Sequence, residues 1–129
     1  MDREQLAAWL SGYERLWRTS GTEGLAEIFS QDAVYSMGPY EEPVRGLDAL
    51  AELWEGERRS ADEEFELKTE IVAVDGDTGV AQVEVEYGPP HEQEYREIWV
   101  IRFGADGRCV RFEEWPYWPD QSSVAPARD

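Results

Sequence analysis

Cysteine and histidine are almost absent from this sequence of 129 residues, which contains one of each. Cys109 has no second cysteine to pair with, so no intrachain disulfide can form, and a reducing, cytoplasmic location is predicted. His91 stands alone in the turn-like segment Gly88-Pro89-Pro90-His91, where a solvated loop histidine is the simplest interpretation. One chain therefore cannot build a metal site from several histidines, and neither a metal nor another cofactor is predicted.

Basic residues are also scarce. Twelve Lys and Arg stand against 29 Asp and Glu, which gives a net charge of -17. Such a surface repels phosphate backbones and anionic lipid, so binding to nucleic acid or to a membrane surface is not expected. No apolar run approaches the length of a membrane span. The charged segment Met1–Gln5 leads into an amphipathic stretch, unlike a signal peptide.

Hydrophobic residues are plentiful at 41%, and they include 6 Trp, 6 Tyr and 4 Phe. A chain of this length can bury one core, and flat aromatic side chains can line a cavity as well as fill a core. We predict a single domain over residues 1–118. Residues 119–129 are polar and rich in Pro, Ser and Ala, which predicts a flexible C-terminal tail.

The first half of the chain has the apolar spacing of helices. Residues 4–18 carry apolar groups three and four positions apart, which predicts an amphipathic helix that Ser20-Gly21 ends. Thr22 is expected to cap a short second helix, and a short strand is expected over residues 32–37. A third helix is predicted after Gly46, and polar residues from Arg58 onward end it.

The second half changes to the alternating pattern of strands. Four long strands are predicted from Glu64 to Val74, from Ala81 to Tyr87, from Tyr95 to Phe103 and from Arg108 to Tyr117. Helices first and hairpin-linked strands afterwards indicate an α+β fold in the order α-α-β-α-β-β-β-β. Each strand has one apolar face, which the helices are expected to cover.

Three local strings carry a resemblance to a known superfamily. They are Leu25-Ala26-Glu27-Ile28-Phe29-Ser30-Gln31-Asp32-Ala33-Val34-Tyr35, Pro43-Val44-Arg45-Gly46-Leu47-Asp48-Ala49-Leu50 and Ile101-Arg102-Phe103-Gly104-Ala105-Asp106-Gly107-Arg108. With the order of elements, they resemble the nuclear transport factor 2-like superfamily, which includes SnoaL-like polyketide cyclases, ketosteroid isomerases, scytalone dehydratase and limonene epoxide hydrolase. The resemblance implies a cone-shaped curved antiparallel sheet packed on N-terminal helices, with a cavity at its open end. It also implies a homodimer formed through the outer sheet face.

Comparison with the ketosteroid isomerases tests whether their catalytic residues are present. Tyr13 falls where their helical tyrosine stands. The position of their general base falls at Met37-Gly38, which carries no carboxylate, and the position of their protonated aspartate falls at Trp99. That isomerase mechanism is therefore not expected. The relay of the epoxide hydrolases and the His–Asp pair of scytalone dehydratase are not recognisable either.

The last hairpin offers other acidic residues. If Gly104–Gly107 forms a tight turn, Phe103 faces Arg108, Ile101 meets Val110, Trp99 meets Phe112 and Glu97 meets Glu114. The resemblance implies that this is the pocket face. Two apposed, buried glutamates raise one pKa, which leaves a carboxylate beside a carboxylic acid. We therefore predict Glu97 and Glu114 as a general base and acid, with Tyr13 as a hydrogen-bond donor.

Two alternatives remain for this pair. A one-residue bulge in either strand would turn one glutamate to solvent, and Arg45 or Arg18 could neutralise the pair. The outer face shows Ile98, Val100 and Trp115 among charged residues, which suits a dimer interface. Aromatic and aliphatic side chains are predicted to line the pocket, although aromatics at this spacing are often plain core: Trp17, Tyr35, Met37, Trp54, Val85, Trp99, Ile101 and Phe112.

Three functions are consistent with these features. The first is a SnoaL-like protein that binds a small hydrophobic molecule and performs metal-free isomerisation, cyclisation, dehydration or hydration. The second is a ligand carrier or sensor without chemistry. The third is a homodimerising domain whose cone is filled by its own side chains, with Trp99 and Trp54 as the plug. The sequence does not identify the ligand.

Overall fold

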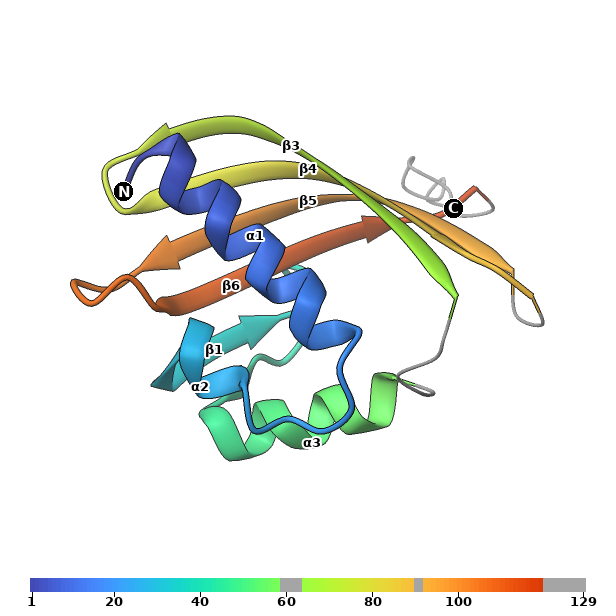
Figure 1. The fold of residues 1–129 in the computed structure, drawn as a ribbon, viewed down its shortest axis with the longest axis horizontal. Helices are drawn as coiled ribbons and strands as arrows, with labels where there is room; N and C mark the ends of the chain where they lie inside the picture. The colour runs from blue at the N-terminus through green and yellow to red at the C-terminus, as the bar shows by residue number, and fades with distance from the viewer. Residues whose placement is uncertain (59–63, 90–91, 120–129) are drawn as a thin grey trace, which may run out of the picture.

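The computed structural model describes residues 1–58, 64–89 and 92–119, and Figure 1 shows the arrangement of its helices and strands. His91 and, except for Pro119, the predicted tail lie outside the described residues. The elements in chain order are α1 (Arg3–Trp17), α2 (Leu25–Ile28), β1 (Phe29–Ser36), β2 (Val44–Arg45), α3 (Leu47–Glu57), β3 (Phe65–Asp75), β4 (Thr78–Tyr87), β5 (Gln93–Phe103) and β6 (Cys109–Tyr117).

The predicted α+β cone is confirmed: helices pack on a curved, unclosed sheet of six strands in the order β2-β1-β6-β5-β4-β3. β3 to β6 pair antiparallel as successive hairpins, whereas β1 pairs parallel with β6, so the sheet is mixed. The short β2, which the sequence pattern did not predict, pairs antiparallel with β1. Helices α1 and α3 lie on the same side of this sheet (Figure 1).

Helix α1 begins with a capping box. The Asp2 side chain accepts from Gln5 N at 2.8 Å, and the Gln5 side chain accepts from Asp2 N at 2.9 Å, which satisfies two backbone donors that the first turn leaves free. The predicted apolar stripe is buried, and Leu6 is fully enclosed. Gly79 on β4 makes this approach possible, because a Cβ there would lie 2.7 Å from a Leu6 methyl group.

The second helix differs from its prediction at both ends. Gly24 occupies the N-cap without a side-chain hydrogen bond, so Thr22 does not cap it; only the Thr22 carbonyl accepts, from Leu25 N at 3.2 Å. Phe29 ends the helix in extended conformation and starts β1, three residues earlier than predicted. Helix α3 follows Gly46 as expected and buries Leu50 and Trp54.

The core between α1 and the sheet is rich in aromatic rings. Trp9 contacts Phe29, Phe103 and Phe112 with ring centroids 5.6 to 6.0 Å apart, and its Nε1 donates to the Ile28 carbonyl at 2.9 Å. The strands alternate as predicted: on β4, Ala81, Val83 and Val85 are buried and the residues between them are exposed. Within the described ranges, no helix is long and apolar enough to cross a membrane.

Candidate functional site

A cavity of about 330 Å³ lies between the C-terminal half of α1, helix α3 and one end of β3 to β6. Tyr13, Tyr35, Glu97, Trp99 and Glu114 are buried and form its inner end, whereas Glu57, Gln93 and Trp118 are exposed near its mouth. Its wall consists of Tyr13, Trp17, Tyr35, Met37, Leu53, Trp54, Glu57, Phe65, Leu67, Val85, Tyr87, Gln93, Tyr95, Glu97, Trp99, Glu114, Pro116 and Trp118.

Six of the side chains predicted to line the pocket do lie in this wall: Trp17, Tyr35, Met37, Trp54, Val85 and Trp99. The predictions for Ile101 and Phe112 were wrong. These two residues pair across β5 and β6, and both are fully enclosed in the core. Phe112 stacks on Tyr35 at 4.7 Å and on Tyr13 at 5.6 Å, so it supports the two tyrosines from behind.

The predicted pairing of the last hairpin was wrong by two residues. Phe103 pairs with Cys109 rather than Arg108, and a bulge at Val110 then makes Arg102 the partner of Arg111. Together the two shifts move the pairing by two residues. Because side chains alternate between the two faces of a strand, the residues of β6 beyond the bulge still lie on the predicted faces. Glu114 consequently lies opposite Trp99, and Glu97 lies opposite Pro116. Val110, placed on the inner face by the prediction, is 38% exposed.

Glu97 and Glu114 nevertheless meet diagonally at the inner end of the cavity. Each is only 9% exposed, and Trp99 Nε1 donates to Glu97 Oε1 at 2.7 Å. Among the described residues, no ion pair involves either glutamate. Arg18 pairs instead with Glu14 at 2.9 Å, and Arg45 is exposed on β2. Neither arginine therefore neutralises the Glu97–Glu114 pair, which was one of the alternatives left open by the sequence.

Burial raises the pKa of Glu114 well above its ordinary value. The negative charge of Glu97, a hydrogen bond to its carboxylate and the charge of Glu57 raise that pKa further. Two carboxyl groups in such contact bind protons as a unit, because ionising both places like charges together in a dry site. Glu114 therefore keeps its proton over a range in which exposed carboxyl groups have lost theirs.

Two tyrosines from different elements complete the inner end. The hydroxyl groups of Tyr13 on α1 and Tyr35 on β1 lie 3.0 Å apart in a hydrogen bond. Burial raises both tyrosine pKa values well above 10.0, and the charge of Glu114 raises them further. Both hydroxyls therefore keep their protons, and the bond between them uses only one of the two as a donor. Alternation along β1 placed Tyr35 in the wall, but its bond to Tyr13 depends on the tertiary fold.

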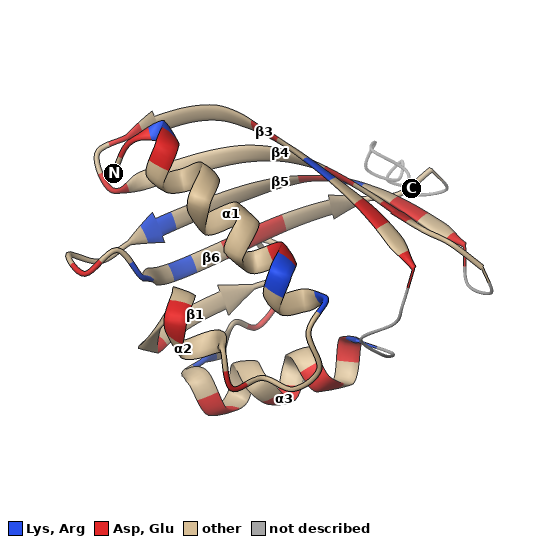
Figure 2. Ribbon diagram, viewed as in Figure 1, with Lys and Arg blue, Asp and Glu red and all other residues tan. Residues whose placement is uncertain are grey.

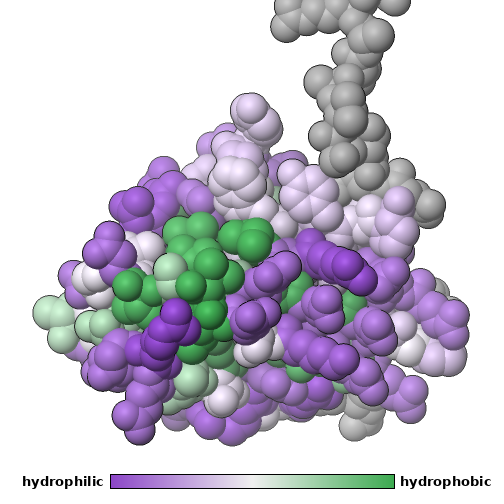
Figure 3. Space-filling view, turned by 90° about the horizontal axis from the view of Figure 1, so that it is seen from above, coloured by the Kyte–Doolittle hydropathy of each residue, from purple (hydrophilic) through white to green (hydrophobic). Residues whose placement is uncertain are grey.

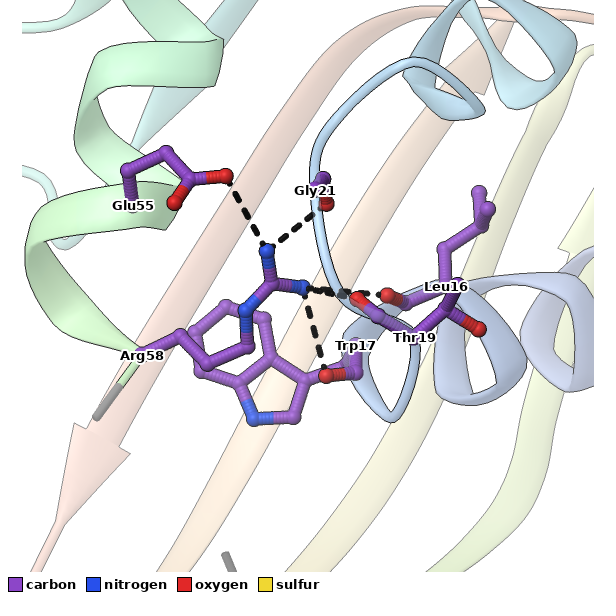
Figure 4. A network of polar contacts seen from close by, with 6 residues as sticks. All are labelled: Leu16, Trp17, Thr19, Gly21, Glu55 and Arg58. Carbon is purple, nitrogen blue, oxygen red and sulfur yellow. Dashed lines mark hydrogen bonds and ion pairs between the residues drawn. The ribbon is translucent and has the colours of Figure 1, made fainter. Parts of the chain in front are cut away.

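Arg58 was interpreted from the sequence as a polar residue that ends a helix, yet it is buried. Its Nη1 donates to Thr19 O at 2.7 Å and its Nη2 donates to Gly21 O at 2.7 Å (Figure 4). Weaker bonds reach Trp17 O at 3.4 Å and Glu55 Oε1 at 3.2 Å. Arg58 thereby links the end of α3 to the segment after α1. Trp17 at the end of α1 and Trp54 in α3 contact each other at 4.9 Å beside this link.

Trp54 contributes an aromatic face and an unpaired donor. It packs edge-on against Tyr13 at 5.0 Å and Trp17 at 4.9 Å. Its Nε1 is buried and has no hydrogen-bond partner among the described residues. The described residues also contain no group of three or more His, Cys, Asp or Glu side chains that could hold a metal ion. The side chains at the inner end of the cavity can donate and accept hydrogen bonds and can exchange protons.

Comparison with known proteins agrees with this architecture. A family model described as a SnoaL-like domain matches residues 10–112. No curated protein matches the chain significantly in sequence.

Solved structures with the same fold include both enzymes and a designed binder. SalBIII, an epoxide hydrolase/cyclase-like enzyme of pyran ring formation in the polyether salinomycin, is 14% identical with a TM-score of 0.73, over 90% of this chain and 93% of that one. A Mycobacterium tuberculosis LEH-like epoxide hydrolase is 16% identical with a TM-score of 0.70, over 88% and 84%. A computationally designed 17-OHP binder is 15% identical with a TM-score of 0.68, over 87% and 91%. At these sequence identities, the likeness shows a shared fold and does not show a shared activity.

Proposed function

Because this chain belongs to the SnoaL-like domain family, we propose that its cavity binds a small hydrophobic molecule and performs metal-free acid/base chemistry on it. The observation that carries this proposal is the contact between Glu97 and Glu114 at the inner end of an aromatic cavity of about 330 Å³. That volume lies within the range of small-molecule sites, and a few convergent polar groups in an apolar wall are typical of them.

The roles follow from where the proton resides. Glu97 is the general base, because it is the member of the pair that accepts from Trp99 and from the acid form of Glu114. Glu114 is the general acid, which returns a proton to an oxygen on which charge develops. Tyr13 supports that oxygen as a donor whose burial prevents ionisation. Isomerisation, cyclisation, dehydration and hydration all consist of such paired proton transfers.

The elimination of 5-nitrobenzisoxazole tests for a base in this cavity without knowledge of the natural substrate. The base removes the ring C–H proton, a nitrile forms as the N–O bond breaks, and the resulting coloured phenolate leaves. We expect the protein to exceed the rate given by free acetate at an equal concentration. Glu97→Gln should lower the rate by at least about a hundredfold, which is the usual contribution of a positioned base.

Glu113→Gln is the matched control, because it removes a carboxyl group from the same strand but from the outer face. It should leave the elimination rate unchanged. A wild-type rate equal to that of acetate would contradict the assignment of a general base. If the probe then still binds, the second function, a ligand carrier without chemistry, becomes the better account.

A self-filled domain is the less favoured candidate. Trp99 and Trp54 are buried as that hypothesis required, with exposed fractions of 3% and 1%. They lie in the wall, however, and the cavity of about 330 Å³ remains beside them.

The free, buried thiol of Cys109 is consistent with the reducing cytoplasmic setting that we propose from the single cysteine.

We also propose that two copies of the chain pair through the outer sheet face. Ile98 and Trp115 are register partners there, and they are 38% and 37% exposed. Arg102 faces Arg111 on β5 and β6, whereas Glu84 and Glu86 lie on the same face of β4. A twofold axis could bring these opposite charges together. Seen from above the orientation of Figure 1, the surface also carries a patch of hydrophobic residues, in green, bordered by hydrophilic ones (Figure 3).

A further inference from the structure

The cavity carries acidic groups and no basic one. Glu57, Glu97 and Glu114 contribute carboxyl groups, and among the described lining residues none is Lys, Arg or His. Acidic residues also dominate the ribbon as a whole, as the red and blue segments of Figure 2 show. A negative potential that narrows into a low-dielectric cleft concentrates cations there and repels anions. A ligand carrying a carboxylate or phosphate group is therefore disfavoured.

The wall between these carboxyl groups is built mainly of aromatic rings. Trp17, Trp54 and Trp99 come from three different elements. The Tyr13 ring centroid lies 4.7 Å from that of Trp99 and 5.0 Å from that of Trp54, and the Trp17 ring contacts Trp54 at 4.9 Å. The faces of such rings attract a cation, most strongly when water is excluded, and tryptophan is the best of them. Aromatic walls with a nearby carboxylate are a means of binding substituted ammonium groups.

Two rings of this wall already carry a cation of the chain itself. The Arg18 guanidinium lies 3.8 Å from the centre of the Phe65 ring, and the Arg58 guanidinium lies 5.8 Å from that of Trp17. Both arginines are occupied: Arg18 by Glu14 and the Phe65 carbonyl, and Arg58 by the carbonyls after α1 and by Glu55. Neither forms an ion pair with Glu97 or Glu114 that could replace a cationic ligand.

We propose that the ligand of this cavity is a hydrophobic organic cation, namely a protonated amine or a quaternary ammonium group, held between the aromatic wall and the Glu97–Glu114 pair. The proposal rests on the proposed function, since it names the ligand class of the same cavity. The apolar part of the ligand would occupy the wide part of the cavity. Its positive charge would lie at the inner end.

Binding of such a cation would be coupled to a proton. The titratable groups that act on Glu114 are Glu97 from β5 and Glu57 from α3, while Tyr13 from α1 and Tyr35 from β1 feel its charge and keep their protons. A cation beside the pair lowers the pKa of Glu114, which makes this group a stronger acid, and part of the bound population releases the proton. Affinity for the cation should therefore increase as the pH rises.

The test compares two probes of nearly identical shape, benzyltrimethylammonium and its neutral isostere neopentylbenzene. Binding is followed through the indole N–H signals of the folded protein by NMR titration. The Trp99 signal reports on the cavity, because Trp99 Nε1 is bonded to Glu97. The Trp115 signal, whose Nε1 is bonded to Glu113 on the outer face, is the internal reference. We expect the cation to bind at least about tenfold more tightly than the isostere.

The double variant Glu97→Gln/Glu114→Gln removes the negative charge and keeps the shape of the site. It should bind the cation and the isostere with nearly equal affinity, whereas Glu113→Gln should still bind the cation more tightly. Calorimetry in two buffers of different ionisation heat should detect proton release with the cation and none with the isostere. If the isostere shifts Trp99 with equal or higher affinity, the cationic ligand class is overturned while a hydrophobic cavity remains. If neither probe shifts Trp99, both the ligand class and the binding function are overturned.

Discussion

Trp99 Nε1 donates to Glu97 Oε1 at 2.7 Å, and the two residues lie two positions apart on the same face of β5. Glu97 thus has a permanent donor from its own strand and a second donor in the acid form of Glu114. The indole fixes which glutamate of the pair is the acceptor, and the proton is left on the other one. This asymmetry distinguishes a base from an acid in a pair of identical residues.

Glu114→Gln tests the raised pKa through protein stability. A carboxyl group whose pKa is higher in the folded than in the unfolded chain contributes stability that is fully present below the unfolded value, near 4.5, and lost as the pH rises through the folded value. The variant keeps the shape without the charge. It should therefore be more stable than wild type at neutral pH, with an advantage that disappears as the pH falls toward 4.5.

Urea denaturation at a series of pH values measures this difference, whose slope cannot exceed about 1.4 kcal/mol per pH unit for one proton. The unfolding free energy of wild type is compared with that of Glu114→Gln because other groups change the stability with pH in the opposite direction. Asp106, for example, has its pKa lowered by hydrogen bonds from the Arg108 backbone and side chain. Glu113→Gln provides the baseline. A constant difference between wild type and Glu114→Gln would contradict a raised pKa at Glu114.

The Tyr13–Tyr35 hydrogen bond predicts non-additive mutations. Either Tyr13→Phe or Tyr35→Phe leaves the other buried hydroxyl without this partner, and each should cost about 1 to 2 kcal/mol of unfolding free energy. The double variant should cost clearly less than the sum, because the second substitution removes a group that has already lost its partner. Simple additivity in a urea-denaturation cycle would mean that the 3.0 Å contact contributes little to stability.

Cys109 should be inert in the folded protein. It is fully enclosed, and burial raises the pKa of its thiol to about 12. Since the thiolate is the reactive form, iodoacetamide at pH 8 should label the native chain far more slowly than the chain unfolded in urea. Mass spectrometry over time measures both rates in the same buffer. Comparable rates would show that β6 opens readily beside β1 or that the thiol is accessible.

The regular elements could be predicted from the sequence because their patterns are local. The 3.6-residue period of α1 and the alternation of β3 to β6 depend on neighbouring residues only, and the structure contains these elements within a few residues of the predicted bounds. The register of the last hairpin could not be predicted in this way. The bulge at Val110 has no glycine or proline at its own position, so the local sequence does not predict the shift.

Arg58 shows a second limit of sequence interpretation. An arginine after a helix followed by another arginine is typical of a solvated end, and nothing local indicates burial. Apart from the nearby Glu55 carboxylate, its partners are backbone carbonyls about forty residues earlier in the chain, with Thr19 O 39 positions away. Such partners have no side-chain signature. A group of carbonyl oxygens that lacks donors is recognisable only once the fold is known.

The proposed pairing of two copies through the outer sheet face predicts a concentration-dependent mass. Wild type should sediment as a dimer at micromolar concentrations, above the 14.8 kDa of one chain. Ile98→Glu or Trp115→Glu should favour the monomer, because each places a charge in the centre of the apolar contact. Ala7→Glu on the exposed side of α1 is the control with the same added charge. A wild-type protein that remains monomeric at all concentrations would contradict the interface.

Removal of Arg58 should destabilise the whole domain and not only the end of α3. The guanidinium satisfies carbonyls of the segment that joins α1 to α2, so Arg58→Met leaves several acceptors without donors in a site where Arg58 is 8% exposed. We expect a loss of about 3 kcal/mol in the free energy of unfolding. Arg58→Lys keeps the charge but not the fork that reaches Thr19 and Gly21 together, so its loss should be intermediate.

Arg15→Met is the matched control, because Arg15 is exposed and lies 3.9 Å from Glu27 in a surface pair, which is worth less than about 1 kcal/mol. The cavity gives a second readout. If Arg58 positions Trp17, the affinity for benzyltrimethylammonium should fall in Arg58→Met even under conditions where the variant is fully folded. A stability within about 0.5 kcal/mol of wild type, the range of an ordinary surface substitution, would show that water replaces the guanidinium at these carbonyls.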